Sequence, residues 1–235
     1  MKEIMNIVPR KPALLLAWFL TCLTTAAQDP PSADKSSNGI ELRLLAVALL
    51  NSAESVVLKS GKAETQPIEL PTHGLSEPIQ VTARTLSVAT PSKGEQSGRI
   101  LDTLQLPGSG RRFLLLLIPT KNAYASRVVR LDDPGFDPGD LCFLNLTEVP
   151  VGGTLGPGKF LARQGIPEIV AAPEPGDKPF YQVRFFYKDA EQTRPLADTR
   201  WPHDEQVRTY VFFFRNPKSG RLTYRAVDED IPSGQ

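Results

Sequence analysis

The sequence is poor in the residues that most often form covalent or metal-bound sites. It contains only two cysteines, two histidines and two methionines. Both methionines and Cys22 lie in the first 27 residues, so a chain that lost this segment would keep Cys142 as its single thiol. No internal disulfide could then form. A chain of about 200 residues can bury a sizeable core without such staples.

The same scarcity argues against several kinds of site. A blue-copper site needs a cysteine and a histidine at close spacing and commonly an axial methionine, whereas Cys142 and His203 are 61 residues apart. "GSGRR", from Gly108, lacks the Gly-x-Ser-x-Gly pattern of a hydrolase nucleophile. "GTLGPGKF" lacks the Gly-Lys-Ser/Thr ending of a phosphate loop and is interpreted as turns. We therefore expect no enzyme activity and no catalytic, cofactor or metal site.

An excess of charge of either sign is also missing. Removal of residues 1–27 takes away three of the 27 basic residues and one of the 26 acidic residues, which leaves 24 and 25. A nucleic-acid-binding protein normally carries a basic stripe or has a high pI. The composition therefore argues against a nucleic-acid partner.

The N-terminal segment has the organisation of an export signal. Three basic residues precede the apolar run from Ala13 to Leu23, and polar, proline-containing sequence follows directly. The run is short for a membrane span, which needs about 20 apolar residues. Small residues at Thr25 and Ala27 suit a signal peptidase, so we predict a signal peptide over residues 1–27.

Two alternatives compete with cleavage after Ala27, an uncleaved membrane anchor and a lipoprotein with the lipid on Cys22. Thr21 fits poorly as the residue before a lipidated cysteine, and the apolar run continues beyond Cys22. We therefore expect an exported protein in the periplasm, at the cell surface or outside the cell, with no membrane span after cleavage.

Long helices are not indicated, because no stretch of a dozen residues has a 3.6-residue apolar period and prolines number 22. Short runs rich in Val, Leu, Phe and Tyr are instead separated by Gly, Pro, Ser and Asp, which is typical of strands and turns. The expected strands lie near 42–50, 54–59, 66–70, 78–88, 100–106, 112–118, 124–131, 140–146, 149–155, 167–171, 180–188, 196–201, 207–214 and 221–227.

Segments of the two halves resemble each other in the same order. "FLLLL" from Phe113 corresponds to "YVFFF" from Tyr210, Lys121 to Lys218, and "LDTLQLP" to "ADTRWP", at spacings of 94 to 97 residues. A unit of about 95 residues with some seven short strands has the size of an immunoglobulin-like β-sandwich. A single larger sandwich with chance similarity is the alternative.

The predicted fold class is all-β, with two tandem immunoglobulin-like β-sandwich domains after the signal peptide. A flexible leader is expected over 28–40, domain 1 over 41–134, a linker over 135–139 and domain 2 over 140–231. Because "FLLLLIP" and "YVFFF" are apolar at consecutive positions, both faces of these strands must be covered, by an opposing sheet and by a neighbour or the other domain.

A binding surface is predicted in the second half. Alternation along "FYQVRFFYKD" places Phe180, Arg184 and Phe186 on the face opposite the core, where they could pack against domain 1 or a partner. Trp201 could be a sugar-stacking platform or a core residue, and His203 beside it a polar loop residue or a pH-sensitive group.

Three function classes follow. The preferred one is a non-enzymatic protein acting by surface contact, as an envelope-associated adaptor, scaffold or assembly component, with a protein or another cell-envelope component as its partner. The alternative is an extracellular carbohydrate-binding module that uses Trp201. A carboxylate-dependent hydrolase built from Asp102 or Asp198 is the third, although these aspartates are also expected to bond nearby backbone amides.

Overall fold

The fold is described from a computed structural model that covers residues 39–50, 54–92, 94, 96–174, 176–190 and 192–231. These residues belong to one compact unit. The predicted signal peptide, Cys22 and nearly all of the predicted leader lie outside the described residues.

The described part of the chain contains seventeen strands and no helix, which confirms the all-β class. No helix of these residues could therefore cross a bilayer. The strands form four sheets with the layered architecture of a β-sandwich. Apolar runs punctuated by Gly and Pro favour this result, because each run is long enough for one strand but too short for a helix.

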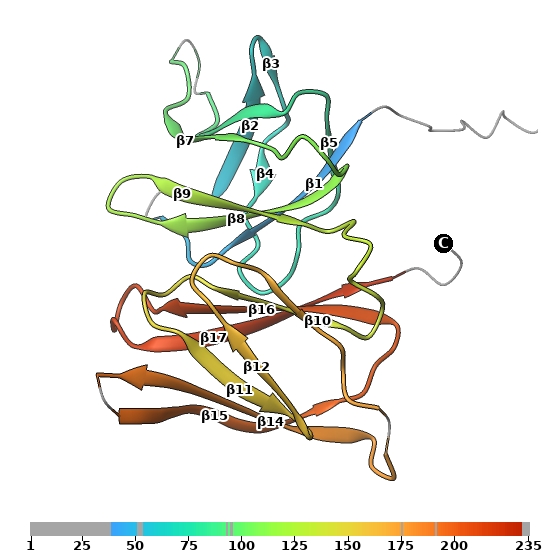
Figure 1. Cartoon of the computed structure of the whole chain (residues 1–235). Helices are drawn as coiled ribbons and strands as arrows, with labels where there is room; N and C mark the ends of the chain where they lie inside the picture. The colour runs from blue at the N-terminus through green and yellow to red at the C-terminus, as the bar shows by residue number, and fades with distance from the viewer. Residues whose placement is uncertain are drawn as a thin grey trace, which may run out of the picture. The chain divides into compact units, whose positions relative to one another are not determined.

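Two sheets come from the first half of the chain (Figure 1). One sheet contains, in spatial order, β5 (Ile79–Val81), β1 (Ile40–Ala46), β8 (Arg112–Pro119) and β9 (Tyr124–Arg130). The other contains β3 (Ala63–Glu64), β2 (Ser55–Ser60), β6 (Thr85–Ala89) and β7 (Ile100–Gln105), with β4 (Ile68–Glu69) paired to β2.

The second half also supplies two sheets. One contains, in spatial order, β13 (Glu168–Val170), β10 (Leu141–Asn145), β16 (Val207–Arg215) and β17 (Leu222–Asp230). The other contains β12 (Gly158–Ala162), β11 (Val151–Leu155), β14 (Phe180–Asp189) and β15 (Gln192–Pro202).

The two halves have the same strand order once the short β4 is set aside. In each half the first strand lies beside the penultimate one and runs parallel to it, as β1 does to β8 and β10 to β16. The other neighbours in these sheets are antiparallel. β8 and β16 therefore occupy corresponding places.

This order differs from the immunoglobulin arrangement that the repeat length suggested. There the first strand shares a sheet with the second, fourth and fifth strands. Here, in the second half, the first strand shares a sheet with the fourth, seventh and eighth. Repeat length and strand number specify the amount of chain in a sandwich, whereas the order depends on which strands pair across long connections.

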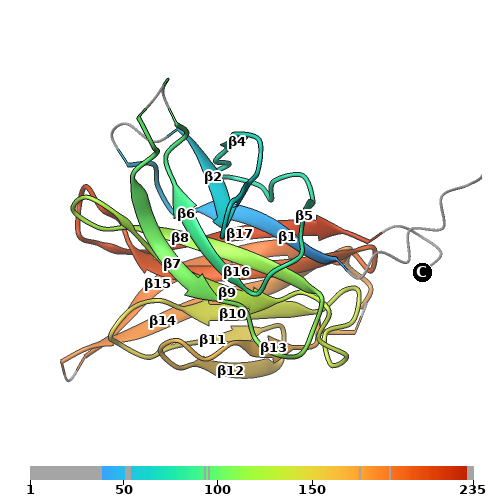
Figure 2. The ribbon, with the colours of Figure 1, turned by 90° about the horizontal axis from the view of Figure 1, so that it is seen from above.

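The four sheets are stacked, with an apolar cluster in each of the three interfaces (Figures 1 and 2). Phe113 and Leu115 of β8 face the cluster inside the first half, whereas Leu114 and Leu116 face the middle cluster. On β16, the buried side chains likewise alternate between the second half's own cluster and the middle one. The prediction that both faces of these two strands are covered is confirmed.

The joint between the halves is a packed interface. Phe136, in the predicted linker, is 1% exposed and contacts the Tyr210 ring edge-on at 5.2 Å. Across the joint, Arg112 Nη2 donates to Glu229 Oε1 at 2.7 Å, and Arg208 Nη1 donates to the Leu131 carbonyl at 3.2 Å. These contacts hold the middle sheets together.

Some strand boundaries differ from the predicted ones. The single strand expected over 78–88 is two strands, β5 and β6, which enter different sheets. The chain crosses between sheets at Arg84, whose guanidinium donates to the carbonyls of Pro107 and Gly110. β12 replaces part of the turn region predicted for "GTLGPGKF", because Phe160 faces the core and anchors a strand there.

Candidate functional site: a cationic cleft at the joint

Two hairpin turns, one from each half of the chain, border the same region of the joint between the halves. The β8–β9 turn is closed by a bond from the Thr120 amide to the Ala123 carbonyl at 2.9 Å. In the β16–β17 turn, Asn216 Oδ1 accepts the backbone amides of Lys218 and Ser219 at 2.9 and 3.2 Å. Such an Asn-capped turn explains why the sequence "NPKSG" reverses the chain.

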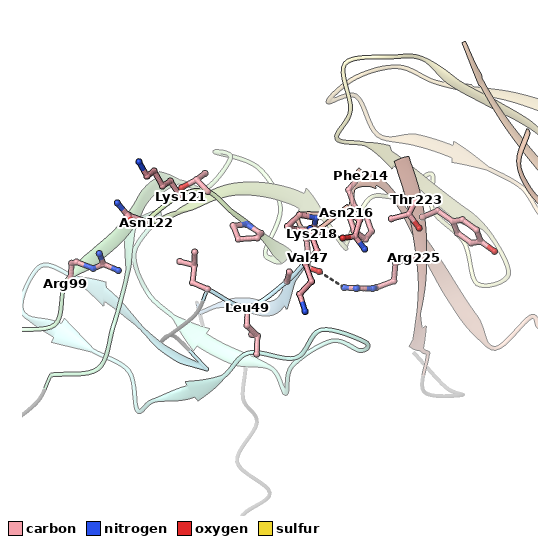
Figure 3. A pocket seen from close by; sticks show the side chains of 16 residues that line it. Val47, Leu49, Arg99, Lys121, Asn122, Phe214, Asn216, Lys218, Thr223 and Arg225 are labelled. Carbon is pink, nitrogen blue, oxygen red and sulfur yellow. Dashed lines mark hydrogen bonds between the residues drawn. The ribbon is translucent and has the colours of Figure 1, made fainter. Parts of the chain in front are cut away.

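A cleft of about 640 Å³ lies between these turns (Figure 3). This volume is within the range of ligand pockets, ~300–1,000 Å³. In Figure 3, Arg99, Lys121 and Asn122 lie on one side of Leu49, and Phe214, Asn216 and Arg225 lie on the other. Both halves of the chain therefore supply its walls.

The described residues that line the cleft include four cations and no acidic side chain. The cations are Arg99, Lys121, Lys218 and Arg225. None of the four forms an ion pair with another described residue. Their positive charges are therefore available to a ligand.

Arg225 is the most constrained of these cations. Its Nη1 donates to the carbonyls of Ala46 and Val47 at 3.2 and 3.1 Å, and its guanidinium lies 5.4 Å from the centre of the Phe214 ring. Burial lowers the pKa of Arg225, because removal from water disfavours the charged form. An arginine nevertheless stays protonated at neutral pH, so a fixed positive charge lies at the cleft wall.

Apolar side chains also line the cleft, beside polar ones such as Asn122 and Asn216. Leu49 is 40% exposed, and Leu50 is held beside it because its amide donates to the Tyr124 hydroxyl at 3.1 Å. Burial raises the pKa of Tyr124, so this phenol is neutral at physiological pH. Pro119 and Pro217 also line the cleft. The cleft can therefore attract the anionic groups of a ligand and at the same time bury the ligand's apolar groups.

No group of three or more His, Cys, Asp or Glu side chains is placed to hold a metal ion within the described ranges. Cys142 is 3% exposed in the middle cluster, where burial raises its thiol pKa to about 12. Because a buried, protonated thiol is unreactive, this position gives Cys142 a structural role.

The predicted surface of Phe180, Arg184 and Phe186 lies on the sheet farthest from the first half. Arg184 is exposed and pairs with Asp198 at 3.2 Å, and Phe186 lines an apolar groove with Leu161. The apolar residues at the joint come instead from the two middle sheets and the linker. Packing of this face against the first half, one of the two uses predicted for it, is therefore wrong, because the sheet of β10 and β16 lies between them. Binding of a partner by this face stays a prediction.

Trp201 and His203 lie together at the end of β15. Trp201 packs against the core of the second half, with its ring centre 5.8 Å from that of Phe185. His203 is half-buried and its Nε2 lies 2.8 Å from the Pro173 carbonyl. Trp201 also lines a pocket of about 190 Å³ with Tyr181.

The two predicted aspartates are not brought together. The Asp102 carboxylate accepts hydrogen bonds from the backbone amides of Thr103 and Ser126 at 2.8 and 2.6 Å, so it links β7 to β9 in the first half. Asp198 lies on the outer sheet of the second half, where it pairs with Arg184. The two middle sheets separate Asp102 from Asp198. The two aspartates also bind different partners, backbone amides for Asp102 and the Arg184 side chain for Asp198.

The sequence did not identify the cleft, although it contained a signal. Lys121 and Lys218 occupy corresponding places in the repeat, at the turns of the two matched hairpins. Only the packing of the middle sheets brings both turns to one side, and Arg99 reaches the cleft from a separate connection.

No protein-family model matches the chain, and no curated protein is significantly similar to it. The function of the cleft has to be inferred from its own geometry.

Proposed function

We propose that the protein is an exported, non-enzymatic contact protein, an adaptor, scaffold or assembly component of the cell envelope. In this proposal the first 27 residues are a cleaved signal and the remainder is a rigid two-domain body. Its partner is a protein or another envelope component that binds across the joint.

The observation that carries the proposal is the cleft between two matched hairpin turns. A site at a joint is rigid only if the joint itself is rigid. The middle apolar cluster and the Arg112–Glu229 pair satisfy this condition. A rigid concave surface binds with a smaller loss of conformational entropy than a mobile one.

The proposal includes a tandem duplication of one β-sandwich domain. This domain is immunoglobulin-like in its layered architecture but not in its strand order. The duplication is supported by the equal strand order in the two halves and the corresponding places of β8 and β16. The proposed boundaries are 41–134 and 140–231, with 135–139 as a joint that Phe136 fixes by burial.

The proposal is tested by isolating the protein from the exporting cell. We expect a processed N-terminus after Ala27, and crosslinks between surface residues and a partner in intact cells. We expect no turnover on a panel of esters, peptides, glycosides and phosphates. Turnover that is lost in His203→Ala or Asp198→Asn would contradict the proposal, as would a chain retained in the cytoplasm.

A carbohydrate-binding role has one observation in its favour. The pocket beside Trp201 is lined by Tyr181 and by the carboxylates of Asp204 and Asp228. Aromatic rings stack on sugar faces, and carboxylates accept hydrogen bonds from hydroxyl groups. The 190 Å³ volume suits a single sugar ring rather than a long polysaccharide cleft.

Trp201→Ala is a poor test of this role, because the ring also packs in the core. Asp204→Ala is better, since Asp204 is exposed and accepts only the Gln206 amide among the described residues. If the pocket binds saccharide, this variant loses binding on a glycan array while its thermal midpoint stays unchanged. Unchanged glycan binding would remove the role.

A further inference from the structure

We infer that the cleft at the joint binds an acidic, extended segment of a partner protein, with carboxylates on its cations and apolar side chains on Leu49 and Pro217. This inference rests on the proposed contact function and specifies the chemistry of its partner.

Charge complementarity is the first support. Arg99, Lys121, Lys218 and Arg225 line one cleft without an acidic neighbour in its described lining. Like charges brought together repel one another, and the repulsion is relieved when anionic groups bind among them. The chain is close to neutral overall, with a formal net charge of +1, so this concentration of positive charge is local.

The distribution of the cations favours several separate carboxylates over one compact anion. In Figure 3, Arg99 and Lys121 lie well apart from Arg225, on the other side of Leu49. The turn beside Lys218 offers no ring of free amides, because the Lys218 and Ser219 amides already bond to Asn216 Oδ1. A single phosphate is usually held by convergent amides or guanidinium groups.

The apolar lining favours a peptide over a bare anion. Leu49 is 40% exposed, and Pro119 and Pro217 border the same space. A small ion in a cleft of about 640 Å³ would leave these groups in contact with water. An extended peptide projects successive side chains in opposite directions, so it can place acidic and apolar groups on different walls.

Asn122 and Asn216 add hydrogen-bonding capacity at the two turns. The Asn216 side-chain oxygen is occupied within its own turn, but an amide group also carries two donors. These donors can bind the peptide carbonyls that an extended ligand exposes. Arg225 acts as the fixed charge, because its bonds to Ala46 and Val47 hold it in place.

The experiment measures binding of a fluorescent peptide of alternating Glu and Leu by anisotropy, with the full-length exported protein. Lys121→Glu combined with Lys218→Glu should weaken binding by at least about tenfold. Removing an attraction and adding a repulsion each change affinity by about fivefold at ~4 Å even in bulk water. Binding by the unsubstituted protein should also weaken between about 50 and 500 mM salt.

The matched control is Lys62→Glu combined with Lys178→Glu, which changes the net charge equally at two exposed lysines outside the cleft lining. Its affinity should remain within about twofold of the original, because exposed charges beyond a Debye length are screened. Thermal midpoints of both double variants show whether they are folded. Should the cleft variant be unfolded, Lys121→Gln with Lys218→Gln replaces it, with a smaller loss expected.

Three outcomes would overturn the inference. They are equal binding by the cleft and control variants, equal binding of a Gln-Leu peptide, and displacement of the acidic peptide by inorganic phosphate at similar molar concentration. The last would assign the cleft to a small anion. If cellular crosslinks persist in the cleft variant, the contact function stands while the acidic segment is excluded.

Discussion

The two halves build the same strand order around chemically different cores. Aliphatic side chains fill the core of the first half, with Phe113 and Tyr124 as its only buried aromatic residues among those described. The second core contains a set of contacting rings, from Phe143, Phe160, Phe185, Phe213, Trp201 and Tyr224. The comparison shows that one strand order accommodates two cores of different side-chain shape, because side-chain shape decides only how the space between the sheets is filled.

One glycine illustrates the difference. Leu58 of β2 lies opposite Val88 in the first half, whereas Gly153 of β11 lies opposite Phe185 in the second. A Cβ on Gly153 would come within 2.6 Å of the Phe160 ring and would also meet the Arg184 carbonyl. The aromatic core therefore needs a missing side chain at a place where the aliphatic core accepts a leucine.

Truncation of the central ring should have the largest effect. Phe185 contacts five other aromatic rings, so Phe185→Ala should lower the free energy of unfolding by about 3–5 kcal/mol. Leu115→Ala in the first core should cost about 2–4 kcal/mol. Urea unfolding measures both values. A smaller loss for Phe185→Ala than for Leu115→Ala would contradict the importance given to the ring cluster.

Gly153→Ala should come next, at about 2–3 kcal/mol, because the new methyl group forces the backbone and the Phe160 ring apart. Gly152→Ala is the matched control. Its Cβ would meet its nearest atoms at 3.5 and 3.8 Å, which are ordinary contacts, so a much smaller change is expected. Thermal unfolding of both variants measures the difference. Equal midpoints would show that the second core accommodates the added methyl group without loss of stability.

Glu229→Gln should lower stability by about 1–3 kcal/mol through the joint rather than through either core. The side chain of Glu229 is 1% exposed and accepts bonds from Arg112 and from the Tyr210 hydroxyl, both at 2.7 Å. Arg112 is 30% exposed, which limits the loss because water can solvate it. Glu41→Gln removes the other ion-pair partner of Arg112 and should lower the free energy of unfolding by less. Denaturant unfolding of both variants tests this order.

The smallest effect concerns the reactivity of Cys142 and not stability. Burial raises its thiol pKa to about 12, so little thiolate exists at neutral pH and the middle cluster also blocks access. In a Cys22→Ser chain, labelling of Cys142 should be slow and should accelerate with denaturant only as the protein unfolds. Fast labelling under native conditions would mean that the halves separate readily.

The sequence pattern predicted a feature correctly where the pattern is compatible with only one structure. The continuous apolar runs of β8 and β16 required burial on both faces, and both faces are buried. Strand β12 was missed because Gly158 and the Gly-Pro pair before it resemble turn residues, and its pairing with β11 depends on the burial of Phe160 in the core. The face with Phe186 was predicted to pack against the first half or a partner, but alternation alone does not say which of two sheets faces the other half.

The all-β class, the two apolar inner strands and the likeness between the halves could be read from the order of residues alone, because local periodicity and turn chemistry act within a few residues. Tertiary structure alone decided which sheets meet, and with that the joint, the buried Glu229 and the cleft. Residues as distant as Lys121 and Lys218 become neighbours of one space only when the middle sheets pack, since that contact depends on surfaces assembled from strands far apart in the chain.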